Sequence, residues 1–200
     1  MENRYEKSKL TNDLKYLQMY IGELLTGYEL NEAICDFYDC DKVSYIQFGT
    51  CLGFISSSLK YRIQMLGYLL FSCNNKTMNI NKVLNKIIFD FLYEDKTVEQ
   101  KIKQRARNLQ SSIEAQRGEF AVLKSYRDSV YAHWEKEIFN NYYQNDFIEN
   151  NKLNFSVFVE LSKICFDCFS EMLNLLNEEP YIRSFPQKTK IEHFIKKFRI

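Results

Sequence analysis

Apolar side chains recur at every third or fourth position through most of this chain, which is the spacing of one helical face. Between residues 5 and 25 the pattern is carried by Leu10, Leu14, Leu17, Ile21 and Leu24. Only six glycines and two prolines interrupt the 200 residues, too few for the many turns of an all-β fold. The sequence therefore predicts an all-α protein, an up-and-down helical bundle with long central helices.

Polar or glycine-containing segments divide this pattern into separate helices. We expect Gly27 to end the first helix, Asn79 to cap the fourth, and Gly118 to interrupt or kink the chain after the fifth. The final helix is short and basic. The predicted helices cover residues 5–25, 29–40, 42–72, 80–93, 96–116, 120–143, 154–177 and 191–200.

The order of these helices suggests three parts. Residues 1–40 form N-terminal helices that pack on a bundle of residues 41–178, and residues 179–200 form a basic C-terminal tail helix. Six Lys or Arg and one Glu lie between Arg183 and Arg199. The tail could contact RNA, contact a protein partner, or dock on the bundle.

Net charge and cysteine content limit where this protein works. A formal net charge of +1 is low for a protein held on nucleic acid by its overall charge, so any such contact must come from local patches. No signal-like N-terminal segment and no membrane-length apolar run is present. We expect a cytoplasmic protein with reduced cysteines and no membrane partner.

Two smaller patterns each leave alternatives open. Cys165 and Cys168 have the CxxC spacing of a zinc half-site or a redox pair, but no second pair follows, and packing in a helical core is the favoured interpretation. Four positive charges and no negative ones lie between Lys101 and Arg107. They form either a solvated helix face or a strip that faces phosphates.

One charged residue interrupts the apolar stripe of the helix predicted after Gly118. On a helical wheel Arg127 shares a narrow stripe with Leu123, Val130, Trp134 and Ile138. An Arg in such a stripe costs folding free energy unless its charge is paired with an acid or serves a functional role. His133 lies about 120° around the helix and ~9 Å along it, so the two side chains meet only if the helix bends or a second protomer contributes.

The string RDSVYAHW at residues 127–134 resembles the HEPN motif, in which an Arg with a polar neighbour is followed within a few residues by a His. It looks most like the AbiU-type abortive-infection branch. The upstream segment at residues 59–87, LKYRIQMLGYLLFSCNNKTMNINKVLNKI, is also similar to that branch. The resemblance covers about residues 40–175.

This resemblance implies a helical bundle that dimerises, with the two motif helices meeting across the interface. Many HEPN proteins are metal-independent endoribonucleases that act as toxins or antiphage effectors, and others are inactive or accessory subunits. In one toxin branch a Tyr two residues after the His is modified by a partner antitoxin. Glu135 stands there in this chain, so that modification is not expected.

The residue types suit cleavage of RNA by its own 2′-hydroxyl. His133 can accept or donate a proton near neutral pH, and Arg127 can neutralise the phosphate oxygens. Without the resemblance, His133 reads as an ordinary histidine and Arg127 as part of a buried ion pair.

Four further residues are assigned secondary roles. Asp128 orients the motif or is a solvated carboxylate, and Tyr126 and Tyr131 either stack on a base or pack in the core. Arg62, on the long helix 42–72, is a possible substrate contact.

The sequence thus predicts a metal-independent endoribonuclease that leaves 2′,3′-cyclic phosphate ends and needs no metal or cofactor. Its expected partners are RNA, a second copy of the chain and possibly an antitoxin protein. Two alternatives stay open: a non-catalytic helical module that binds RNA or protein, and a nucleotide-binding protein that does not cleave.

Overall fold

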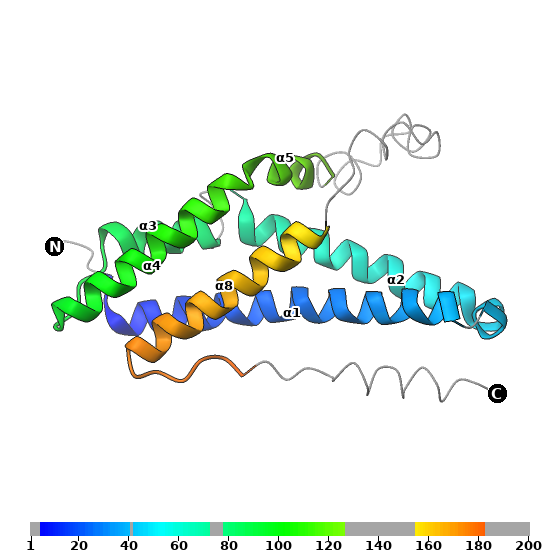
Figure 1. Ribbon diagram of the computed structural model, residues 1–200, viewed down its shortest axis with the longest axis horizontal. Coiled ribbons are helices and arrows are strands. Elements are labelled where there is room, and N and C mark those ends of the chain that lie inside the picture. The colour runs from blue at the N-terminus through cyan, green and yellow to red at the C-terminus, as the bar shows by residue number, and fades with distance from the viewer. Residues whose placement is uncertain (1–4, 41, 73–77, 127–154, 183–200) are drawn as a thin grey trace.

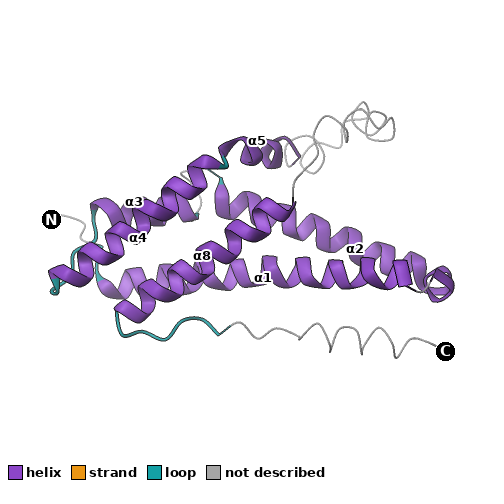
Figure 2. Ribbon diagram, in the orientation of Figure 1, coloured by secondary structure: helices purple, strands orange, loops and turns teal. Residues whose placement is uncertain are grey.

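The computed structural model describes residues 5–40, 42–72, 78–126 and 155–182. Within these ranges the protein is all-α, as predicted, and no residue belongs to a strand (Figure 2). A single parallel bridge joins Tyr5 to Phe91. The helices are α1 (Lys7–Cys40), α2 (Lys42–Phe71), α3 (Ile80–Phe89), α4 (Lys96–Ala115), α5 (Arg117–Tyr126) and α8 (Phe155–Leu175).

Two long helices form the backbone of the bundle. Figure 1 shows α1 and α2 side by side and running in opposite directions, with α8 crossing α1. The helices α3 and α4 pack together near the start of α1, and α4 also contacts α8. From the end of α4, α5 extends onward and contacts α2. None of the helices within the described ranges is long and apolar enough to span a membrane.

The expected helix end at Gly27 is wrong, because α1 continues unbroken from Lys7 to Cys40. Gly27 is buried, and a Cβ at this position would lie 3.3 Å from Cγ1 of Ile63 on α2. Glycine costs about 1 kcal/mol inside a helix relative to alanine, and here it lets α2 approach closely. The predicted pair of N-terminal helices is therefore one helix that packs directly on α2 and α8.

The helix α3 begins as predicted and ends earlier than predicted. Asn79 is its N-cap, and its side-chain oxygen accepts a hydrogen bond of 2.8 Å from the Lys82 backbone N–H. The helix ends at Phe89, and not at residue 93, because the Asp90 carbonyl accepts a bond from the Tyr5 backbone N–H. Phe91 then turns inward and is fully buried.

The remaining boundaries follow the sequence pattern closely. The chain breaks between α4 and α5 at Gln116, two residues before Gly118. The helix predicted at 154–177 is α8, and Asn177 ends it with a positive φ of 55° while the Glu178 N–H bonds back to the Leu173 carbonyl. The rest of the helix predicted at 120–143, and the tail helix, lie outside the described residues.

Candidate functional site

The sequence-predicted site follows α5 in the amino-acid sequence. Tyr126 is the last residue of this helix. Arg127, Asp128, Tyr131 and His133 come after it and lie outside the described residues. The geometry that can be described is therefore that of α5 itself and of the helices packed against it.

Arg62 is the one predicted contact residue whose side chain is described. It lies on α2 and donates a 2.7 Å hydrogen bond from Nη2 to the Glu23 carboxylate of α1. Its side chain remains 62% exposed. A guanidinium has five N–H donors, so the ion pair with Glu23 leaves donors that can reach a ligand from solvent.

A pocket of about 420 Å³ opens between the end of α2 and α5. Its aromatic wall includes Phe71 and Phe120, whose rings stack with centroids 5.2 Å apart and planes 3° from parallel. The pocket is lined by Tyr68, Phe71, Ser72, Arg117, Phe120, Ala121 and Lys124. We call it the α5 pocket.

One hydroxyl group in the α5 pocket is buried without a partner. Ser72 directly follows α2, and its Oγ atom has no hydrogen-bond partner among the described residues. A buried polar atom left unbonded costs roughly 1–3 kcal/mol. The wall of the pocket therefore includes a buried polar group without a partner among the described residues.

Two cations from α5 border the same pocket. Arg117 and Lys124 are seven residues apart, which puts them on one side of the helix about two turns apart. Lys124 is exposed. Among the described residues Arg117 makes one long ion pair, of 3.9 Å with Glu114, and its side chain is 77% exposed. The α5 pocket thus combines aromatic walls with two accessible positive charges.

The basic run at residues 101–107 does not form one strip. Lys103 pairs with Glu99 at 2.8 Å on α4, while Arg105 pairs with Glu171 on α8. Residues two apart do not face the same side of a helix, whereas residues four apart do, so Lys101 and Arg105 share one side of α4 and Lys103 and Arg107 share another. Lys101 and Arg107 are exposed and make no ion pair within the described ranges.

Glu99 anchors the first turn of α4. It is buried, and its carboxylate accepts hydrogen bonds from Lys103, from the Tyr93 backbone N–H and from Lys96. These donors, Lys103 first, lower the pKa of Glu99 to about 2. Lys103 is committed to this network, which removes it from the set of residues available to a phosphate.

Cys165 and Cys168 behave as packing residues of α8. Cys165 is fully buried, as predicted, and burial raises its pKa well above the usual range. The pKa of Cys168 is raised to about 11, mainly by burial and then by Glu171. Both are thiols near neutral pH, and no cluster of three potential metal ligands occurs in the described part of the chain.

The sequence analysis missed the α5 pocket. Ser72 and Tyr68 come from a helix far away in the sequence, so no local pattern connects them to α5. The seven-residue spacing of Arg117 and Lys124 was the one feature of the sequence that pointed to this pocket.

Comparison with known proteins identifies no relatives of this chain. No protein-family model, curated protein or solved structure matches it.

Proposed function

We propose that this protein is a metal-independent endoribonuclease of the HEPN type, with Arg127 and His133 as its catalytic residues. On this proposal it works in the cytoplasm as a toxin or an antiphage effector. The motif RDSVYAHW on an all-α chain supports the assignment. The observation that carries it furthest is the α5 pocket, whose cationic and aromatic walls border the helix that leads into the motif.

The proposed reaction needs only proton transfer and positive charge. The 2′-hydroxyl loses its proton to His133, and its oxygen attacks the adjacent phosphorus. The bond from phosphorus to the 5′-oxygen breaks, and that oxygen takes a proton from a protonated histidine, supplied by the second protomer. Arg127 neutralises the phosphate oxygens as charge builds on them. The products are a 2′,3′-cyclic phosphate and a 5′-hydroxyl.

Four residues have supporting roles in this proposal. Asp128 orients the motif, and Tyr126 and Tyr131 offer aromatic faces to the bases beside the scissile phosphate. Arg62 of α2 is a further contact to the substrate, reached through the donors that Glu23 leaves open. The α5 pocket adds two cations that could hold the RNA backbone, Arg117 and Lys124.

The proposal includes a homodimer, because one His cannot serve as base and acid in the same step. The described part of α2 carries an apolar stripe that a second copy could cover. Phe54, Tyr61 and Leu69 are all exposed, Phe54 by 74%, and their spacings of seven and eight residues put them on one side of the helix. An antitoxin protein is a further possible partner of the same surface.

The alternative is a non-catalytic helical module that binds RNA or protein. The net charge of +1 favours it, since a nuclease usually gathers more positive charge. The exposed apolar stripe of α2 also favours it, because such a surface suits a protein partner. The two functions differ in one observable, which is whether RNA is cut.

The deciding experiment incubates the purified protein with a defined single-stranded RNA in the presence of EDTA. His133→Ala and Arg127→Ala are compared with wild type, and His193→Ala is the matched control for loss of a histidine. We expect cleavage with 2′,3′-cyclic phosphate ends by wild type and by His193→Ala, and none by the two motif variants. Intact RNA with every protein, from chains with unchanged circular dichroism, would move the assignment to the binding module.

A further inference from the structure

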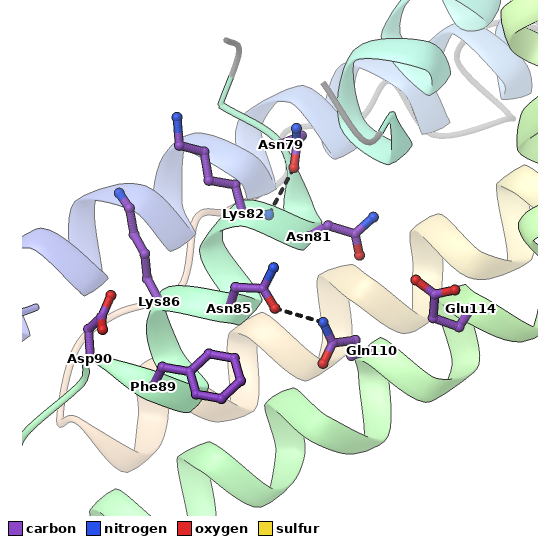
Figure 3. A pocket seen from close by; sticks show the side chains of 9 residues that line it. All are labelled: Asn79, Asn81, Lys82, Asn85, Lys86, Phe89, Asp90, Gln110 and Glu114. Carbon is purple, nitrogen blue, oxygen red and sulfur yellow. Dashed lines mark hydrogen bonds between the residues drawn. The ribbon is translucent and has the colours of Figure 1, made fainter. Parts of the chain in front are cut away.

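A second groove lies between α3 and α4, and it shares no lining residue with the α5 pocket. It has a volume of about 440 Å³, within the range of small-ligand sites. Figure 3 shows Asn81, Asn85 and Phe89 on the side of α3 that faces α4, with Gln110 and Glu114 opposite them. The three α3 residues are spaced four apart, so they form one stripe along the helix.

An exposed amide pair bridges the α3 and α4 walls of this groove. Nε2 of Gln110 donates a 2.9 Å hydrogen bond to Oδ1 of Asn85 (Figure 3). The bond fixes both amides and leaves the Asn85 NH₂ group as a donor and the Gln110 oxygen as an acceptor. A donor beside an acceptor matches the hydrogen-bonding edge of a nucleobase.

Asn81 adds an unsatisfied polar atom to the same wall. Its Oδ1 atom is buried and has no hydrogen-bond partner among the described residues. A buried acceptor left unbonded costs roughly 1–3 kcal/mol. Four amide side chains therefore line the groove, those of Asn79, Asn81, Asn85 and Gln110, and the Asn81 oxygen lacks a partner among the described residues.

Phe89 supplies an aromatic face at the end of the groove. Its side chain is 74% exposed, although the other large apolar side chains of α3 are buried. Stacking of a base on an aromatic ring is favourable and does not depend on which base is present. A single exposed Phe has little meaning alone, but this one stands beside amides that can bind the edge of a stacked base.

A cation lies about one helical turn before Gln110 on α4. Arg107 lies three residues before Gln110 and hence on the same side of α4. It is exposed and has no ion pair in the described ranges. Lys86, in contrast, is held by Asp13 at 3.5 Å and lies over the Tyr5 ring. Arg107 is thus a cation of α4, outside the lining of the groove, that can bind a phosphate next to the bound base.

One ion pair connects the lining of the groove with the lining of the α5 pocket. Glu114 lines the groove, Arg117 lines the pocket, and the two side chains are paired at 3.9 Å. A ligand that occupies both sites must be a chain and not a single nucleotide. Positive charges at Arg107 on α4 and at Arg117 and Lys124 on α5 follow one another along the chain.

We propose that the α3–α4 groove binds an unpaired nucleotide of a single-stranded RNA that continues past α5. The base stacks on Phe89, its edge bonds to Asn85 and Gln110, and a neighbouring phosphate binds Arg107. This proposal rests on RNA being the ligand of the protein, but it does not require that the RNA is cleaved.

The test measures binding of a fluorescein-labelled 12-nucleotide single-stranded RNA by fluorescence anisotropy, with full-length protein in the His133→Ala background. We expect Phe89→Leu to raise Kd about tenfold, and Phe89→Tyr, which keeps the stacking face, to restore it. Asn85→Asp should raise Kd by a similar factor, because it removes the donors and adds a negative charge.

A matched control is available on the same helix. Gln104 and Asn108 form a second amide pair on α4 with the same bond length, 2.9 Å, and both are exposed. Asn108→Asp should leave Kd unchanged. The proposal is wrong if Phe89→Leu binds like the parent protein, if Asn108→Asp weakens binding as much as Asn85→Asp, or if the parent binds no RNA. If free AMP at the same concentration as the RNA displaces the RNA, the ligand is a single nucleotide and the proposal of an RNA chain is wrong.

Measuring RNA binding and RNA cleavage separately distinguishes the proposal for the groove from the proposed nuclease activity. RNA binding that depends on Phe89, in a wild-type protein that cuts no RNA, keeps the groove and rejects the nuclease. Cleavage that depends on His133, with binding insensitive to Phe89, keeps the nuclease and rejects the groove.

Discussion

Gln18 of α1 donates a 2.8 Å hydrogen bond to the Ser170 hydroxyl of α8, across 152 positions of sequence. The same amide donates to the Phe166 carbonyl and accepts a bond from the Tyr181 backbone N–H. Gln18 is fully buried. One side chain thus joins α1, α8 and the segment that follows α8. Both the NH₂ group and the oxygen of its amide are hydrogen-bonded.

Replacing Gln18 by Leu should destabilise the fold. The Tyr181 N–H would lose its acceptor inside the protein, and we expect the free energy of unfolding to fall by about 2 kcal/mol. Urea denaturation followed by circular dichroism measures this. Gln100→Leu, at an exposed position of α4, is the control and should change stability by less than about 0.5 kcal/mol. Equal stability of the two variants would contradict the role assigned to Gln18.

Glu99 should make stability depend on pH in the acid range. Its pKa is lowered from 4.5 to about 2 in the folded protein. A lowered pKa stabilises the fold fully above the unfolded value, and this contribution is lost as pH falls through the folded value. Glu99→Gln should therefore cost about 2 kcal/mol at pH 7, and the difference from wild type should shrink below pH 4.5 and disappear near pH 2. A difference that stays constant from pH 7 to pH 3 would rule out this linkage.

Lys124 should contribute one phosphate contact if the α5 pocket holds RNA. Each neutralised phosphate adds about 0.7 to the salt dependence of single-strand binding. Lys124→Ala should weaken binding and reduce the slope of log Kd against log salt by about that amount. Lys9→Ala, at an exposed position of α1, should leave the slope as in wild type. The same slope in all three proteins would remove Lys124 from the RNA path.

Phe54 should report on the proposed homodimer. Phe54→Glu places a charge in the apolar stripe of α2, and we expect the protein to elute as a monomer, because burying an unpaired carboxylate is costly. Light scattering after size exclusion measures the mass. Lys60→Glu adds the same carboxylate at an exposed position of the same helix and should leave the mass at that of two chains. A dimer of Phe54→Glu would show that another surface forms the interface.

The spacing of apolar residues was sufficient to predict the fold class and most helix boundaries. The helices at 42–72, 96–116 and 154–177 were predicted to within two residues of α2, α4 and α8. The cap at Asn79 was also visible, since capping depends on neighbouring residues. These helix boundaries and this cap depend on residues only a few positions apart, so a short stretch of sequence is enough to predict them.

Two boundaries were set by distant contacts. Gly27 looked like a helix end, but the approach of Ile63 from α2 explains the glycine. The early end of α3 depends on Tyr5, more than eighty residues before Asp90 in the sequence. No window along the chain contains both members of either pair.

The candidate sites divide in the same way. The sequence by itself determined the all-α fold, the motif that contains Arg127 and His133, and the pattern that fills the core. Only the tertiary structure decided that Arg105 is paired with Glu171, that Ser72 shares a pocket with Lys124, and that Asn85 meets Gln110. The physical reason is that a helix fixes only which residues share a side, while the packing of one helix on another decides which charges and amides are neutralised and which remain open to a ligand.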